Sequence, residues 1–200
     1  MNQVAGLLLA AGAGSRLGTP KALLEVDGQP LVRRGVRVLR LGGCAPVAVV
    51  VGAAASRVAD ATLAVDAEVV HNPAWASGMG SSLRAGLEAL AGRAAAVVIA
   101  LVDQPSVGPE VVRRLQRAWR TGATVAAAAY DGRQGNPVLL DAAVWQAVAD
   151  RAVGDVGARE FLSDHPDLVT LVACDDVGGP GDIDTPDDLA AWRGEEQPCS

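Results

Sequence analysis

Histidine, cysteine, lysine and aromatic residues are all scarce in this sequence of 200 residues. The two histidines, His71 and His165, do not lie at metal-ligand spacing from a cysteine, and there is no Cys-x-x-Cys pair. This pattern excludes the usual zinc sites, and an odd number of scattered cysteines does not make a disulfide framework. We therefore expect Cys44, Cys174 and Cys199 to be ordinary core, strand or tail residues.

Excess positive charge is also lacking, because the formal net charge is −6 and the pI is about 4.9. This balance argues against a nucleic-acid partner, since binding to a phosphate backbone needs a basic surface. The apolar run at the N-terminus is too short to cross a bilayer and follows no basic residues, so we expect a cytoplasmic protein with no membrane association. Small anionic substrates remain compatible, provided that a local basic cluster and a metal offset the overall charge.

One lysine, Lys21, stands among basic residues that are otherwise all arginine. It closes the run LAAGAGSRLGTPK, residues 9–21, which follows an apolar, strand-like segment. Glycines in the run let backbone N–H groups approach an anion, while Arg16 and Lys21 add a forked donor and a compact charge. The run therefore predicts a site for the phosphates of a nucleotide. The residues expected there are Leu9, Ala10, Ala11, Gly12, Gly14, Ser15, Arg16 and Lys21.

The spacing of this run separates it from two common phosphate motifs. Its glycines follow GxGxxxG rather than GxGxxG, and no acid follows at the ribose position, which excludes the dinucleotide fingerprint. Lys21 follows Pro20, and no Ser or Thr comes after it, which excludes a Walker A loop. A plain glycine-rich turn is the simpler interpretation, but such a turn does not require Ser15, Arg16 and Lys21 in one stretch.

The order of apolar segments predicts one α/β domain. The sequence is 50% hydrophobic and shows no linker, so a single core is expected over residues 1–193, with a flexible tail at 194–200. Buried strands alternate with helical spacing, which is typical of a doubly wound, Rossmann-like, mostly parallel sheet with ligands at the carboxyl ends of its strands. The expected strands are 4–10, 47–51, 68–71, 95–102, 124–130, 138–140 and 168–173, and the expected helices are 30–41, 56–63, 158–162, one around 145–148, and three that begin at 81, 109 and 186.

Acidic residues follow the most hydrophobic strand and precede the last helix. Asp103 comes directly after the segment 95–102, at the expected ligand edge of the sheet. Proteins hold Mg²⁺ with one or two carboxylates plus phosphate oxygens, so Asp103 is a predicted Mg²⁺ ligand, the alternative being an Asx turn or a helix cap. Asp182 and Asp184 offer a second acid. We favour Asp184 as the second ligand, although acids here also suit the dipole of the last helix.

Two further polar regions contain glycines next to helix starts. In the loop NPAWASGMGSSL, residues 72–83, Gly80, Ser81 and Ser82 are predicted to hold a base or an anion. Trp75 is expected to be a packing residue, and with aromatic residues at 3% we do not expect a bound base to stack on a ring. The later segments GNPVLL and GDVGAR are predicted to contact a second substrate through Asn136, Asp155, Gly157 and Arg159.

Six segments together resemble one known family: LAAGAGSRLGTPK, NPAWASGMGSSLRAGL, DQP, GNPVLL, GDVGAR and DIDTPDDL. In this order they resemble the MobA-like nucleotidyltransferases, in particular the molybdenum-cofactor cytidylyltransferases, over nearly the whole chain. The resemblance implies a nucleotide-diphosphosugar transferase fold and an Mg²⁺-dependent enzyme that joins an NTP to a phosphorylated acceptor and releases pyrophosphate. It also implies that Arg16, Lys21 and Asp103 are catalytic and that Asp103 and Asp184 hold the metal.

The resemblance also indicates the substrates. Family members that use GTP tend to carry LAGG at the start of the loop, whereas cytidylyl-type members carry AAG, so Ala11 favours CTP over GTP. The implied acceptor is molybdopterin, with a molybdoenzyme or its chaperone as a partner. Because the acceptor phosphate is already anionic, no protein nucleophile is needed, and in-line positioning and charge neutralisation are the main requirements.

Two alternatives stay open. One is an enzyme of the same fold that uses GTP or another acceptor, such as a sugar 1-phosphate or phospholactate. The other is a nucleotide-binding accessory protein without catalysis, because fold alone does not establish activity.

Overall fold

The computed structural model describes residues 3–193, which form a mixed seven-stranded sheet in the order β5-β4-β1-β6-β8-β7-β9. Six strands run in one direction, and β8 is antiparallel to both of its neighbours. The mostly parallel α/β fold expected from the sequence is therefore confirmed. The strands are β1 (Val4–Leu9), β4 (Val47–Val51), β5 (Glu68–His71), β6 (Ala96–Leu101), β7 (Val125–Tyr130), β8 (Arg133–Asp141) and β9 (Val169–Ala173).

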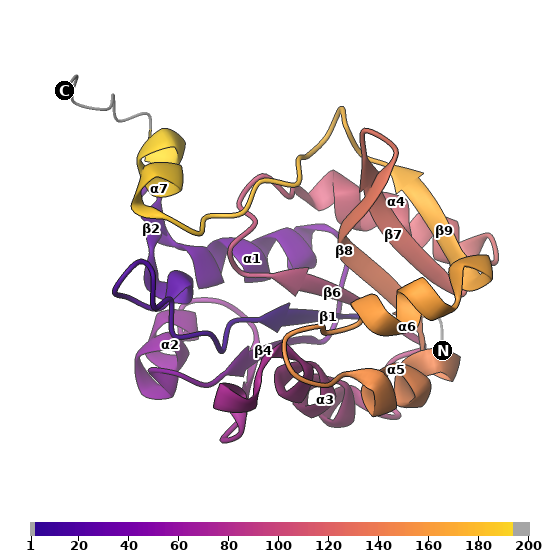
Figure 1. The fold of residues 1–200 in the computed structure, drawn as a ribbon, viewed down its shortest axis with the longest axis horizontal. Coiled ribbons are helices and arrows are strands. Elements are labelled where there is room, and N and C mark those ends of the chain that lie inside the picture. Colours follow the sequence, from indigo (N-terminus) through magenta and orange to yellow (C-terminus); the bar gives the residue numbers. More distant parts are fainter. Residues whose placement is uncertain (1–2, 194–200) are drawn as a thin grey trace.

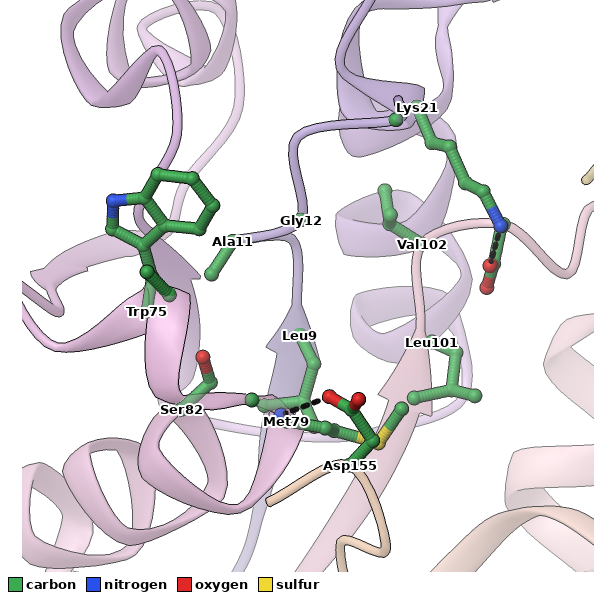
Figure 2. A pocket seen from close by; sticks show the side chains of 14 residues that line it. Leu9, Ala11, Gly12, Lys21, Trp75, Met79, Ser82, Leu101, Val102 and Asp155 are labelled. Atoms are coloured by element: carbon green, nitrogen blue, oxygen red, sulfur yellow. Dashed lines mark hydrogen bonds and ion pairs between the residues drawn. The ribbon is translucent and has the colours of Figure 1, made fainter. Parts of the chain in front are cut away.

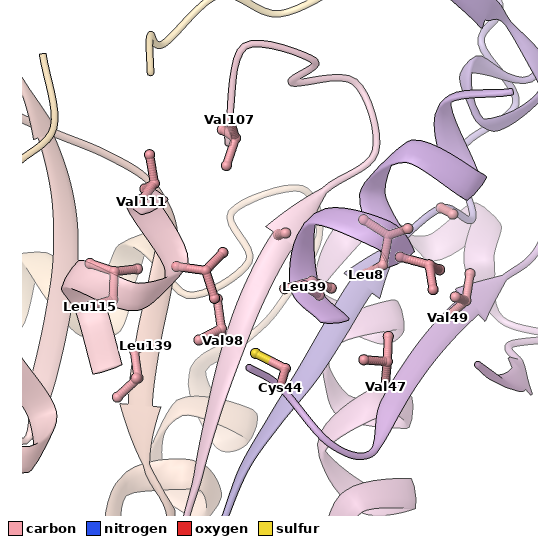
Figure 3. Packing of buried hydrophobic residues seen from close by; sticks show 14 of the residues in the cluster. Leu8, Leu39, Cys44, Val47, Val49, Val98, Val107, Val111, Leu115 and Leu139 are labelled. Atoms are coloured by element: carbon pink, nitrogen blue, oxygen red, sulfur yellow. The ribbon is translucent and has the colours of Figure 1, made fainter. Parts of the chain in front are cut away.

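Helices cover both faces of this sheet, as Figure 1 shows. The central strands are apolar on both sides, because each face packs against its own helix layer. Figure 3 shows one of these two cores, in which Leu39, Val111 and Leu115 pack against strand residues. The helices on that face are α1 (Leu31–Leu41), α2 (Ala55–Thr62) and α4 (Pro109–Arg120), and those on the other are α3 (Met79–Leu90), α5 (Trp145–Arg151) and α6 (Arg159–Asp164).

A small separate cluster lies at one end of the sheet. The hairpin of β2 (Glu25–Val26) and β3 (Gln29–Pro30) packs against the last helix, α7 (Pro186–Arg193), with Ile183 fully buried between them. Figure 1 shows α7 beside β2. This cluster places the segment before α7 next to the carboxyl ends of β1 and β6.

Helix α3 lies unusually close to β1 because Gly86 faces the strand. A Cβ at Gly86 would lie 2.4 Å from the Leu7 side chain, which is fully buried. Only glycine permits this approach without repacking. The close approach brings the start of α3 to the carboxyl end of β1, where the glycine-rich run begins.

The structure differs from the expected elements in three places. Strand β8 begins at Arg133, so most of the segment DGRQGNP is strand, and the turn is confined to Asp131 and Gly132, which both have positive φ. The short β2–β3 hairpin was not expected, although the dipeptide Asp27-Gly28 favours such a turn. Helix α3 begins at Met79 rather than at Ser81, and Gly78 takes the cap position without a side-chain cap.

Three further expectations concern the cysteines, the chain ends and membranes. Cys44 and Cys174 are buried free thiols, and burial raises the pKa of Cys44 to about 12, which fits a structural role. Cys199 and the expected tail at 194–200 lie outside the described residues, so the domain boundary stays a prediction. No helix within residues 3–193 combines the length and the apolar character needed to cross a membrane.

Candidate active site

The structure brings Lys21, Asp103 and Asp184 together at the carboxyl end of the sheet. Strands β1 and β6 are neighbours with Leu9 opposite Leu101, so the loop after β1 and the acid after β6 meet there. The Lys21 ammonium donates to Asp103 Oδ2 at 2.6 Å and to Asp184 Oδ1 at 2.5 Å. Residues that are 82 and 163 positions from Lys21 thus share one cation.

These ion pairs are partly shielded from water. The side chains of Lys21 and Asp103 are 20% and 19% exposed, and that of Asp184 is 45% exposed. Burial lowers the pKa of Lys21, but hydrogen bonds to Asp103 and Asp184 outweigh it, so the pKa lies above its ordinary value. Lys21 is therefore charged at neutral pH.

The choice between Asp182 and Asp184 follows from how their segment is anchored. Ile183 points into the α7 cluster, and its N–H donates to the Asp103 carbonyl at 2.9 Å. Asp184 then reaches Lys21, whereas Asp182 accepts a hydrogen bond from the Gln104 side chain at 2.7 Å. Burial raises the pKa of Asp182, and the Gln104 hydrogen bond opposes this rise. The contact with Lys21 supports the preference for Asp184.

The donor chemistry of Asp103 and Asp184 fits a divalent cation such as Mg²⁺ or Mn²⁺. Both offer hard carboxylate oxygens, and their shared contact with Lys21 marks a position that favours positive charge. Within residues 3–193, no group of three or more His, Cys, Asp or Glu residues forms a ready-made metal cluster. The two carboxylates therefore suit an ion that takes its other ligands from phosphate and water.

A cavity of about 350 Å³ opens beside this cluster (Figure 2). Eight of the predicted site residues line it: Leu9, Ala11, Gly12, Gly14, Lys21, Ser82, Asp103 and Asp155. Gly14 has φ of +62°, and a Cβ there would lie 2.0 Å from the Thr19 carbonyl oxygen, so the tight loop requires glycine at this position. Arg16 stands at the margin, 73% exposed and 3.9 Å from Asp184. Ala10 is buried directly after β1 and Ser15 is exposed, and neither lines this cavity.

A second cavity of about 190 Å³ adjoins the first. Its lining contains all four residues predicted to contact a second substrate: Asn136, Asp155, Gly157 and Arg159. Leu9, Met79, Leu101 and Asp155 line both cavities, so the two spaces meet along this wall. Asp155 Oδ1 also accepts a hydrogen bond of 3.3 Å from the Met79 N–H at the start of α3. The arrangement offers one space at Lys21 and a neighbouring space for a second molecule.

The loop at residues 72–83 is organised by the buried side chain of Asn72. Its amide donates to the hydroxyls of Ser81 and Ser82 at 2.8 and 3.0 Å, and its oxygen accepts from the Ala74 N–H at 3.0 Å. Ser81 in turn donates to the Ala74 and Gly78 carbonyls. Of the three residues predicted to hold a base, only Ser82 lines the first cavity.

Gly80 has a different neighbour, the segment 152–154. Its N–H donates to the Gly154 carbonyl at 2.8 Å, and a Cβ there would lie 2.3 Å from the Ala152 carbonyl oxygen. Gly80 therefore lets this segment dock on the start of α3. The docking holds Asp155 at the wall between the two cavities.

We expect Gly80→Ala to lower the free energy of unfolding by about 1–3 kcal/mol, because the added methyl collides with a backbone carbonyl. The cost of the collision exceeds the gain of about 1 kcal/mol that replacing glycine by alanine brings to a helix. Urea denaturation gives the value, and Gly181→Ala is the control because no atom lies within 4 Å of a Cβ at that position. Equal stability of the two variants would show that the docking of residues 152–154 does not depend on glycine.

Sequence reasoning missed Trp75 and Met79, which line the first cavity with Ala76 and Gly78. Trp75 was expected to pack, and it does pack against the core beside α3, but it also lines the cavity. Met79 had no role assigned to it. The available signal was their place between a strand end and a helix start. Such loops at the carboxyl edge of an α/β sheet supply ligand contacts.

Comparison with known proteins identifies the family. Residues 6–169 match the family described as the MobA-like NTP transferase domain. The chain is 42% identical to nicotine blue oxidoreductase of Paenarthrobacter nicotinovorans, covering 91% of this chain and 92% of that protein. It is 30% identical to Rv0371c of Mycobacterium tuberculosis H37Rv, whose crystal structure matches with a TM-score of 0.82 over 96% of this chain and 98% of that one. A structure of Rv0371c in complex with manganese matches at 28% identity and a TM-score of 0.77, over 97% and 100% of the two chains. On the strength of the family match, which covers most of its length, the chain belongs to the MobA-like NTP transferase family.

Proposed function

We propose that this protein is a divalent-metal-dependent nucleotidyltransferase that moves the nucleoside monophosphate of an NTP onto a phosphorylated acceptor. The observation that carries the proposal is the cluster of Lys21, Asp103 and Asp184, of which Lys21 and Asp103 line a cavity that adjoins a second one. The phosphate loop and Lys21 bind the triphosphate in the first cavity. Asp103 and Asp184 would hold Mg²⁺, which would neutralise charge on the phosphates.

The reaction needs no protein nucleophile. A phosphate oxygen of the acceptor attacks the α-phosphorus, the new O–P bond forms, and the bond to the β-phosphate oxygen breaks as pyrophosphate leaves. The chain holds the reactants in line and stabilises the charge that develops on the leaving group. Lys21 in the first cavity and Arg16 near Asp184 would contact the leaving pyrophosphate. The acceptor phosphate would reach the α-phosphorus where the two cavities meet, beside Met79 and Asp155.

The acceptor enters the second cavity. Its lining is about equally apolar and polar, with Leu83, Ile99 and Val138 beside the polar groups of Asn136 and Arg159. Arg159 offers a cation for the anionic group of an acceptor, and molybdopterin is the acceptor proposed from the resemblance. CTP is the proposed donor on the basis of Ala11, which lines the first cavity. The resemblance also predicts that a molybdoenzyme or its chaperone receives the product.

An acceptor panel tests the proposal. Purified protein with Mg²⁺ is incubated with CTP or GTP and with molybdopterin, a sugar 1-phosphate or phospholactate, and pyrophosphate release is measured. We expect release with CTP and molybdopterin and a smaller rate with GTP. Pyrophosphate release with another donor and acceptor would support the same reaction with different substrates. Nucleotide binding with no release for any pair would favour a non-catalytic accessory protein.

A redox reaction is the second candidate, favoured by one observation. The relative from Paenarthrobacter nicotinovorans, 42% identical over 91% of this chain, is named an oxidoreductase. A redox activity therefore occurs in the name of a relative even though this sequence has no dinucleotide fingerprint. Such a reaction needs an electron donor, such as a reduced nicotinamide nucleotide, and an aromatic, quinone-like acceptor. Donor oxidation that depends on the acceptor, followed by absorbance without any pyrophosphate release, would favour this candidate.

A further inference from the structure

We propose that the indole of Trp75 is a substrate-binding surface on which the nucleobase of the bound NTP stacks. This role differs from the packing role that the sequence indicated for Trp75. The inference rests on the proposed function, because it requires a nucleotide in the first cavity. It names the residue that supplies the binding surface for the base.

The first argument is the position of Trp75 relative to the phosphate end of the cavity. Lys21 and Asp103 line the same cavity as Trp75, Ala76 and Ser82. Figure 2 shows the indole and Lys21 on opposite sides of the segment that carries Ala11 and Gly12. If the triphosphate contacts Lys21, the nucleoside extends along this segment to the part of the cavity that Trp75 lines.

The second argument is that the residues expected to hold the base are engaged elsewhere. Gly80 packs against the Ala152 carbonyl, and the Ser81 hydroxyl donates to the carbonyls of Ala74 and Gly78. Ser82 alone of the three reaches the cavity. The ligand-facing surface of the loop 72–83 is instead formed by Trp75, Ala76, Gly78, Met79 and Ser82.

The third argument is that the backbone of Trp75 is fixed before a ligand arrives. Trp75 begins a short 3-10 helix, Trp75–Ser77, whose entry is held by the Asn72 side chain through the Ala74 N–H. The base of its side chain packs on Gly52, where a Cβ would lie 2.4 Å from the Cβ of Trp75, and against the core beside α3. Binding to a surface fixed in this way costs little ordering entropy. The side chain is nevertheless only half-buried, so part of the ring remains available.

The chemistry of the ring defines what it contributes. Within residues 3–193, Trp75 is the single aromatic residue that lines either of the two adjoining cavities. An aromatic face stacks on any base, so it adds affinity without selecting among bases. Selection then falls to groups at the base edge, such as the Ser82 hydroxyl. Removing the ring should therefore weaken nucleotide binding in the ground state and the transition state alike, which raises KM and leaves kcat nearly unchanged.

The test compares a nucleotide with a ligand that has no base. Dissociation constants for CTP and for inorganic triphosphate, each with Mg²⁺, are measured by calorimetry for the wild type, Trp75→Phe and Trp75→Leu. Stacking on one ring is worth enough to predict that Trp75→Leu weakens CTP binding about tenfold to a hundredfold. Trp75→Phe should weaken it less, and inorganic triphosphate should bind all three proteins equally.

Fluorescence supplies a second readout. CTP should quench the tryptophan emission of the wild type, and this quenching should be lost in Trp75→Phe. Trp192→Phe is the matched control, because Trp192 lies on α7 and packs against the separate cluster around Ile183. The control should retain the quenching.

Two outcomes would overturn the inference while leaving the proposed function intact. One is unchanged CTP affinity in Trp75→Leu, and the other is equal weakening of CTP and inorganic triphosphate, which would mean that Trp75 acts only by shaping the loop. A wild-type protein that binds neither CTP nor GTP would instead overturn the proposed function and this inference together.

Discussion

Lys21→Met is expected to bind Mn²⁺ more tightly than the wild type in the absence of nucleotide, while losing turnover. The Lys21 ammonium contacts both Asp103 and Asp184, so a divalent cation has to compete with it for the same oxygens. At an effective dielectric constant of 20, two unit charges 4 Å apart interact by about 4 kcal/mol, so removing the ammonium should tighten Mn²⁺ binding at least about tenfold. Titration of Mn²⁺ followed by electron paramagnetic resonance measures this affinity directly.

The same variant should lose turnover by about a hundredfold to a thousandfold, because a positive group that faces the leaving pyrophosphate is gone. Arg16→Met is the matched control for charge, since Arg16 is 73% exposed and 3.9 Å from Asp184. It should change Mn²⁺ affinity far less. Unchanged Mn²⁺ binding in a folded Lys21→Met protein would mean that the metal does not occupy the position between these carboxylates.

Asp103→Asn is expected to abolish metal-dependent turnover, by at least about a thousandfold, with little loss of stability. The amide keeps the shape of the side chain but removes the negative charge that a divalent ion requires. Lys21 keeps Asp184 as a partner, so the substitution does not leave an isolated buried charge. Pyrophosphate release with Mg²⁺ or Mn²⁺ gives the activity, and thermal unfolding gives the stability.

Asp182→Asn is the control for this prediction, because Asp182 pairs with Gln104 rather than with Lys21. It should retain most of the activity. Activity of Asp103→Asn equal to that of Asp182→Asn would remove Asp103 from the proposed metal site.

Much of the fold could be predicted from the sequence because hydrophobic burial dominates it. The apolar runs that become β1, β4 and β6 are buried on both faces, and only a covered parallel sheet accommodates such runs. The meeting of Lys21 and Asp103 followed from the same reasoning, since parallel strands end at a common edge. Strand β8 was less visible because its first half, Arg133 to Asn136, is polar or lacks a large side chain.

The site was harder to predict where side-chain direction decides the role. Ser81 and Ser82 are adjacent, yet one turns toward backbone carbonyls and the other toward the cavity. Helix α3 starts two residues earlier than expected, and this changes which residues of the loop face the ligand. Trp75 was expected to pack, and it does pack against the core beside α3, but its place on the cavity wall depends on contact with Gly52, which is distant in the sequence.

The central claim is that the loop after β1, Lys21 and the two carboxylates together receive a nucleoside triphosphate with its metal. A crystal structure with Mg²⁺ and an α,β-methylene analogue of CTP tests it most directly. We expect triphosphate oxygens at the N–H groups of residues 12–18 and at Lys21, and a metal bound to Asp103 and Asp184. A nucleotide bound elsewhere, with the Lys21 ammonium still joined to both carboxylates, would contradict the account.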